Sequence, residues 1–265
     1  MMGRLTPTVK NLLIINLILF ILPQIFGLSG INRILGLYYF DSAYFYPFQF
    51  FTYMFSHGGF SHIFFNMLGL FFLGPLLEQF WGAKRFLTFY LATGIGAGFI
   101  YLFINFFTLN PMKNAMENYI VNPDPDAFYT YIAEYSRYGD FDYNNRLYET
   151  YYDNPNNEAL QEQTTLVVRN MYERKINIPM VGASGAIYGI LMAFGLLFPN
   201  TELMLLFPPI PIKAKYLVLI LGGMAIYSGF KDNPGDNTAH FAHLGGMIVS
   251  YIVLKYWQRN SKNFY

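Results

Sequence analysis

Four polar residues that could carry out acyl transfer stand inside otherwise apolar segments of this sequence. Ser184 lies in the stretch GASGAIYG, and His243 lies in TAHFAHLGG. A serine hydroxyl is a weak nucleophile until a neighbouring imidazole accepts its proton, which is the division of roles in a serine hydrolase. His62 and Asn66 lie in SHIFFNMLGL, four residues apart and therefore on one face of a helix. Their N–H groups are suited to stabilising an oxyanion.

Other chemistries lack some of their parts. His240 and His243 could bind a metal, but no HExxH motif or nearby carboxylate accompanies them, so we expect no metal and no cofactor. The chain has no cysteine, which excludes a thiolate nucleophile. The apolar segments contain no aspartate, which excludes a pair of catalytic aspartates. Glu78 belongs to the opposite end of its segment, so the pattern predicts a Ser-His dyad without an acidic third member.

Composition indicates the environment of these residues. Of 265 residues, 54% are hydrophobic, 20% aromatic and only 12% charged, whereas soluble domains carry about 25% charged residues. The formal net charge is +1. These values exclude a disordered chain, a collagen-like fibre and a basic protein that binds nucleic acid. A membrane protein, with the lipid bilayer as a partner, remains.

Six segments are apolar and nearly long enough to cross a bilayer as helices, which takes about 20 residues. They are 11–31, 61–81, 86–108, 180–199, 213–231 and 239–257. The first could also be a signal peptide, but no small-residue cleavage motif follows it. We therefore expect an all-α membrane protein with six transmembrane helices.

The basic residues of the short connections predict the orientation, because such residues stay cytoplasmic. With both termini in the cytoplasm, only Arg33 and Lys231 fall in short outer connections. The inner ones contain Arg4, Lys10, Lys84, Arg85, Lys213, Lys215, Lys255, Arg259 and Lys262. The second, fourth and sixth spans then run inward, so the polar groups that open them lie at similar depth in the outer half of the bilayer. Each of these polar groups, taken alone, has an ordinary structural explanation. Their shared depth in the bilayer favours a catalytic role.

Two segments differ from the spans. Residues 32–60 contain Asp41, Pro47 and many tyrosines, which suit the headgroup level. Residues 109–178 hold 11 acidic and 6 basic residues and 10 tyrosines. We expect a partly helical extracytoplasmic insertion there, with an amphipathic helix near 157–175. It either has a binding role or forms a solvated cap.

Small residues at four-residue spacing predict that the fourth and sixth spans touch, because such stripes let helices approach closely in lipid. Tyr188, four residues after Ser184, could then pack against the ring of His243, although plain helix packing would also explain it. The stripes consist of Gly185 and Gly189, and of Ala242, Gly246 and Ser250.

These motifs resemble the rhomboid family of intramembrane serine proteases. The resemblance rests on His62-x-x-x-Asn66, Gly182-Ala183-Ser184-Gly185 and Ala242-His243-x-Gly245-Gly246, in the family's order. It covers about 45–108 and 179–257, and the first span completes a six-helix core. The divisions are then an N-terminal segment with the first span (1–36), a first core segment (37–108), the insertion (109–178), a second core segment (179–257) and a cytoplasmic tail (258–265).

The resemblance implies a role for each residue. Ser184 would attack the scissile carbonyl, and His243 would activate it and protonate the leaving amine. His62, Asn66 and the backbone N–H of Ser184 would stabilise the oxyanion. The supporting residues would be Gly182, which leaves room for the substrate, Tyr188, which stacks on the catalytic histidine, and His57, which matches a histidine of relatives.

The resemblance also implies the activity, the cleavage of single-span transmembrane substrates near the outer membrane face. Span five and the 231–238 loop would be movable. The expected location is a bacterial plasma membrane. Two departures limit the inference: Phe48-Gln49-Phe50-Phe51 stands where many relatives have Trp-Arg, and the insertion has no counterpart in the minimal core. The alternatives are a non-catalytic rhomboid-like protein that binds transmembrane helices, and a transporter.

Overall fold

The computed structural model describes residues 5–28, 30–204, 209–231 and 239–260. Arg4, Lys262, most of the 231–238 loop and the end of the predicted tail lie outside these ranges. The chain forms two compact units. The first consists of Met1–Leu37, Tyr46–Leu102 and Met180–Tyr265, and the second of Tyr38–Phe45 and Phe103–Pro179.

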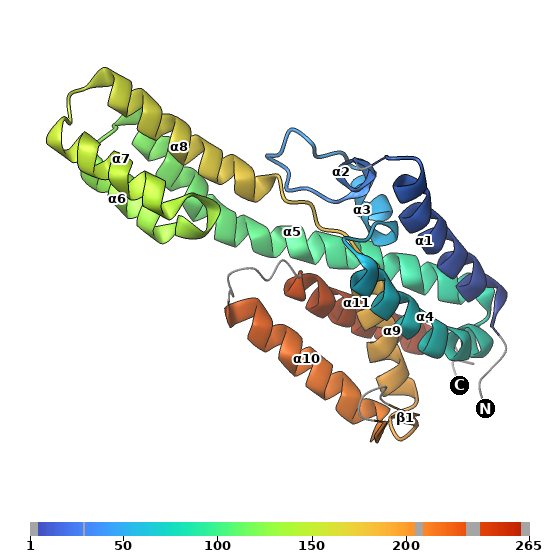
Figure 1. Cartoon of the computed structure of the whole chain (residues 1–265). Coiled ribbons are helices and arrows are strands. Elements are labelled where there is room, and N and C mark those ends of the chain that lie inside the picture. The colour runs from blue at the N-terminus through green and yellow to red at the C-terminus, as the bar shows by residue number, and fades with distance from the viewer. Residues whose placement is uncertain (1–4, 29, 205–208, 232–238, 261–265) are drawn as a thin grey trace. The chain divides into compact units, whose positions relative to one another are not determined.

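The described residues are mostly helical (Figure 1). The first unit contains α1 (Pro7–Ile25), α2 (Ile31–Leu35), α3 (Gln49–Thr52), the 3₁₀ turn η1 (Tyr53–Phe55), α4 (Phe60–Trp81), α9 (Ser184–Leu197), α10 (Ala214–Lys231) and α11 (His240–Asn260). One feature was not predicted: β1 (Glu202–Met204) pairs antiparallel with β2 (Pro211–Lys213) in a small hairpin.

Among the described residues, three helices are long and apolar enough to span a membrane, namely α1, α4 and α5 (Ala83–Val121). They overlap the first three predicted spans. α9 is apolar but has only 14 residues, about 21 Å at 1.5 Å per residue, against a hydrocarbon core of about 30 Å. α10 and α11 have 18 and 21 residues but are less apolar. The six-span count therefore stays a prediction.

A buried carboxylate fixes the start of α1 against α4. Pro7 occupies the first turn of α1, where its missing N–H costs no hydrogen bond. Glu78 of α4 accepts hydrogen bonds from the Thr6 hydroxyl at 2.5 Å, the Thr8 N–H at 3.0 Å and the Val9 N–H at 2.9 Å. A negative group at a helix N-terminus satisfies free N–H groups and complements the helix dipole. Glu78, predicted at the cytoplasmic end of its span, thus has a structural contact.

The second unit contains the end of α5, α6 (Pro125–Glu134), η2 (Ser136–Tyr138), α7 (Phe141–Asp153) and α8 (Glu158–Ile176). α8 matches the amphipathic helix predicted near 157–175. α5 continues to Val121, well beyond the predicted end of the third span at 108. Pro111 lies inside this helix and does not end it. Side chains of Asp124, Asp140 and Asn157 cap the N-termini of α6, α7 and α8.

Residues 38–45 pack within the second unit through a small polar cluster. Asp41 accepts hydrogen bonds from Lys113 at 2.9 Å and from the Tyr172 hydroxyl at 2.7 Å. Ser42 donates to the side chain of Asn177 at 2.6 Å. Burial raises the pKa of Asp41, but the hydrogen bonds from Lys113 and Tyr172 outweigh it and hold that pKa below its ordinary value of 3.8.

Candidate active site

Ser184 is the first residue of α9, and an extended segment delivers the chain to it. Met180 pairs antiparallel with Leu37, and the N–H of Gly182 donates to the carbonyl of Tyr53 at 2.9 Å. These bonds satisfy backbone groups that a helix would otherwise satisfy internally, as an apolar environment requires. The predicted span at 180–199 is therefore helical only from Ser184 onward, and the free N–H groups of the first turn of α9 lie beside the serine.

Gly182 makes the turn into α9. Its φ is +117°, a region that favours glycine. A side chain at this position would also collide with the imidazole of His62. The residue therefore combines an unusual backbone conformation with a close approach to another predicted site residue.

The hydroxyl of Ser184 and the ring of His243 lie within hydrogen-bond distance. The Oγ atom of Ser184 is 2.8 Å from the Nε2 atom of His243, across 59 residues of sequence. His243 is only 8% exposed. A neutral imidazole at this distance can accept the hydroxyl proton, which is the geometry that a general base needs.

Close packing of α9 against α11 makes this distance possible (Figure 1). Gly246 of α11 approaches the backbone of Gly185 so closely that a Cβ atom at 246 would overlap the Gly185 carbonyl oxygen. α9 also packs on α5, since Cβ atoms at Gly185 and Gly189 would lie 2.7 Å from Ala97 and from Thr93 respectively. The predicted contact between the two glycine-containing segments is found.

Tyr188 stacks on the imidazole of His243. The ring centroids are 4.2 Å apart and the planes differ by 5°. Tyr188 is one turn after Ser184 on the same face of α9, so one helix presents both the hydroxyl and the ring that holds its partner in orientation. The structure thus places the tyrosine where the sequence pattern predicted it.

His62 and Asn66 lie on one face of α4, which packs against α9. Asn66 is 5% exposed, and its Nδ2 donates to the carbonyl oxygen of His62 at 2.9 Å. Because an amide nitrogen carries two N–H groups, one remains for an oxyanion. The approach of Gly182 to His62 brings α4 to the turn that precedes the serine.

His57 lies beside His62. The two ring centroids are 5.1 Å apart and the planes are tilted by 72°. Burial, followed by the neighbouring imidazole of His62, lowers the pKa of His57 to about 3, so its ring is neutral at physiological pH. His57 therefore contacts the predicted site through His62.

Three supporting residues were not predicted. The side chain of Asn32 donates to the carbonyl of His57 at 3.1 Å and accepts a hydrogen bond from Ser56 at 2.5 Å. Tyr53, besides its backbone bond to Gly182, donates its hydroxyl to the carbonyl of Gly94 at 2.6 Å. No motif marks these residues, and only a polar side chain in an aromatic segment could have drawn attention to Asn32.

No cluster of three or more His, Asp and Glu side chains suited to a metal ion occurs among the residues that the structure describes. The rings of His240 and His243 are 6.0 Å apart and nearly perpendicular. The arrangement around Ser184 thus offers a hydroxyl, an imidazole and N–H donors.

Comparison with protein families gives a match. A family model described as "Rhomboid domain" matches residues 45–109 and 160–259. The matched ranges include all seven predicted site residues. No curated protein matches the chain.

Proposed function

The chain belongs to the rhomboid family, and we propose that it is an intramembrane serine endopeptidase that cleaves transmembrane proteins near the outer membrane face. The observation that carries this proposal is the 2.8 Å approach of the Ser184 hydroxyl to the His243 imidazole. Members that only bind transmembrane helices have no need of a nucleophile aligned with a base. The aligned pair therefore favours the protease over the non-catalytic alternative.

In the proposed reaction, Ser184 attacks the scissile carbonyl carbon while Nε2 of His243 accepts the hydroxyl proton. Stacking on Tyr188 keeps the imidazole in plane for this transfer. The imidazolium then donates the proton to the leaving amine, and an acyl-enzyme remains on Ser184. Water, deprotonated by the same imidazole, hydrolyses the ester and restores the hydroxyl.

The negative charge of the tetrahedral intermediate develops beside Ser184. The backbone N–H of Ser184 is free of intrahelical partners because this residue begins α9. We assign the second and third donors to the imidazole of His62 and the amide of Asn66. The space around Ser184 must admit water, and a substrate helix must unwind locally to expose its carbonyl, since helical hydrogen bonds shield the backbone.

The proposed substrates are single-span proteins with small or helix-breaking residues near the outer end of the span. We propose a bacterial plasma membrane location with both termini in the cytoplasm, on the basis of the basic residues in the short connections. The aromatic segment around Phe48–Phe51 would then lie at the headgroup level.

The test is labelling of the full chain in detergent with a fluorescent fluorophosphonate, combined with cleavage of a model transmembrane substrate in proteoliposomes. Ser184→Ala and His243→Ala should lose both signals while their melting temperatures stay close to wild type. Ser250→Ala is the matched control, because the Ser250 hydroxyl is buried on α11 without a hydrogen-bond partner among the described residues. Cleavage that persists in Ser184→Ala would reject the nucleophile and the proposed function.

Asn66→Ala separates the donor role from the nucleophile role. Loss of one oxyanion donor typically costs about 3 to 4 kcal/mol, so turnover should fall about 10²- to 10³-fold while fluorophosphonate labelling persists at a lower rate. Complete loss of labelling in this variant would indicate that Asn66 has another role.

A further inference from the structure

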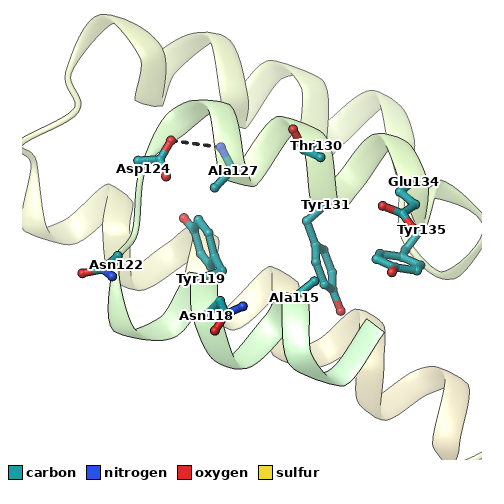
Figure 2. Close-up of a pocket in the computed structure, with 10 residues that line it drawn as sticks. All are labelled: Ala115, Asn118, Tyr119, Asn122, Asp124, Ala127, Thr130, Tyr131, Glu134 and Tyr135. Atoms are coloured by element: carbon teal, nitrogen blue, oxygen red, sulfur yellow. Dashed lines mark hydrogen bonds between the residues drawn. The ribbon is translucent and has the colours of Figure 1, made fainter. Parts of the chain in front are cut away.

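The second unit contains a pocket of about 400 Å³ between the end of α5 and α6 (Figure 2). Tyr119 points from α5 toward α6 and Tyr131 points back, but they are only 2% and 3% exposed and offer a ligand little surface. Asp124 caps the start of α6 and Glu134 is its last residue, about 15 Å of helix away. One charged group cannot pair with both carboxylates, so the pocket points to no ligand.

Asn32 of the short helix α2 holds a buried stretch of backbone in the first unit. Its side-chain amide donates a hydrogen bond to the carbonyl of His57 at 3.1 Å and accepts one from the hydroxyl of Ser56 at 2.5 Å. Ser56 and His57 are only 2% and 3% exposed, so water cannot readily replace either bond. One amide therefore fixes two consecutive residues of the segment that leads into α4.

α2 is itself fastened to its neighbour α3, which lies beside it (Figure 1). The amide of Gln49 donates to the carbonyl of Ile34 at 3.3 Å, and the hydroxyl of Thr52 donates to the carbonyl of Leu35 at 2.8 Å. These bonds satisfy carbonyls at the end of α2 that have no partner within the helix. Asn32 therefore projects from an anchored helix.

The segment that Asn32 fixes places a ring against His62. The ring of His57 lies 5.1 Å from that of His62, with the planes tilted by 72°. The orientation of His62 follows from its approach to Gly182, because a Cβ atom at 182 would have Nε2 of His62 as its nearest neighbour. Nε2 thus faces the turn that leads to Ser184, which is the orientation that an oxyanion donor needs.

We propose that Asn32 is a positioning residue of the protease: it holds His57 against His62 and so keeps Nε2 of His62 directed at the oxyanion. This role rests on the proposed function, since it belongs to that reaction. Asn32 lies outside residues 45–109 and 160–259, which match the family model, so the match gives it no role. A merely structural amide would change stability alone, whereas a positioning residue changes the stabilisation of the transition state.

The test measures cleavage of a model transmembrane substrate by the full chain in proteoliposomes. Asn32→Ala should lower kcat about fivefold to twentyfold, within the range of coupling between residues in contact. KM should stay within about twofold of wild type, because the oxyanion exists only after the serine has attacked. Ser56→Ala removes one of the two bonds and should lower kcat about twofold to fourfold.

A double-mutant cycle with His62→Ala shows whether the effect passes through this imidazole. In the His62→Ala background, Asn32→Ala should change kcat by less than about 1.5-fold, because no ring remains to be positioned. Asn16→Ala is the matched control, since it removes another buried amide, which donates to the carbonyl of Leu12 at 2.7 Å on α1. It should lower the melting temperature and keep the wild-type kcat and KM.

An equal fold loss of kcat from Asn32→Ala with and without His62 would overturn the proposal, because the amide would then act through another group. A wild-type kcat in Asn32→Ala, or a loss of kcat in Asn16→Ala as large as in Asn32→Ala, would also overturn it. If Asn32→Ala does not fold, the same cycle with Ser56→Ala decides, and equal losses in both backgrounds count against the role.

Ser184→Ala separates the two proposals. Cleavage that persists in this variant rejects the protease itself. Loss of cleavage in Ser184→Ala together with a wild-type kcat in Asn32→Ala rejects only the role of Asn32.

Discussion

Replacing Gly246 by alanine tests whether the close approach of α9 and α11 sets the distance between Ser184 and His243. A Cβ atom at 246 would overlap the Gly185 carbonyl oxygen and lie 2.8 Å from its carbonyl carbon. Carbon atoms in contact prefer about 3.5 to 4.0 Å, so the helices must separate by about 1 Å. The hydrogen bond of 2.8 Å between Oγ and Nε2 would then stretch to about 3.8 Å, beyond the range of hydrogen bonding.

The expected result is a fall of about 100-fold in kcat, since a displacement of 1 Å costs about that much in a positioned catalytic pair. Overpacking should also lower the free energy of unfolding by about 1 to 3 kcal/mol. The assays are cleavage of a transmembrane substrate in proteoliposomes and thermal unfolding followed by circular dichroism.

Gly223→Ala is the matched control, because a Cβ atom at this helical glycine of α10 would meet no described atom within 4 Å. It should keep wild-type kcat and gain slightly in stability, because alanine favours helices over glycine. If Gly246→Ala folds and keeps wild-type kcat, close helix packing does not position the dyad and the argument is refuted.

Three other predictions concern single contacts. Tyr188→Ala should lower kcat about threefold to tenfold, which corresponds to the loss of an aromatic stack of about 0.5 to 1.5 kcal/mol. Tyr188→Phe keeps the stack and should keep the wild-type kcat. An equal loss of kcat in both variants would point to the tyrosine hydroxyl instead. Glu78→Gln should lower the unfolding free energy by about 1.5 to 3 kcal/mol because it weakens three bonds to the start of α1, measured by thermal unfolding against the exposed control Glu162→Gln. Asp41→Asn should lower the unfolding free energy at neutral pH, and this loss should disappear as the pH falls below the ordinary pKa of 3.8. The reason is that a carboxylate whose pKa is lowered by folding contributes stability only above that range. A difference in unfolding free energy that stays constant from about pH 7 to about pH 2 would contradict it.

The positions of the apolar helices could be predicted from local sequence, because an apolar run long enough for a bilayer has few alternative structures. The first predicted span, 11–31, corresponds to α1 at Pro7–Ile25, with a boundary shifted by a proline that the hydropathy pattern ignores. The third predicted span, 86–108, lies within α5, whose helical backbone continues to Val121 although the hydropathy falls at residue 108.

Part of the candidate site could also be predicted from local sequence. The four-residue spacing of Ser184 and Tyr188 places both on one helix face whatever surrounds them, because helical periodicity is local. The start of α9 at the serine itself was not predictable, since it depends on backbone bonds from Leu37 and Tyr53. The same holds for the position of His57, which the ring of His62 and the side chain of Asn32 determine.

The sequence by itself determined that a hydroxyl, two imidazoles and an amide stand in apolar helices, and that glycines allow two of these helices to approach. Only the tertiary structure decided that Ser184 and His243 meet across 59 residues. The physical reason is the range of the interactions. Helical periodicity and hydropathy act between near neighbours in the chain, whereas a distance between side chains on different helices depends on the packing of every residue between their axes.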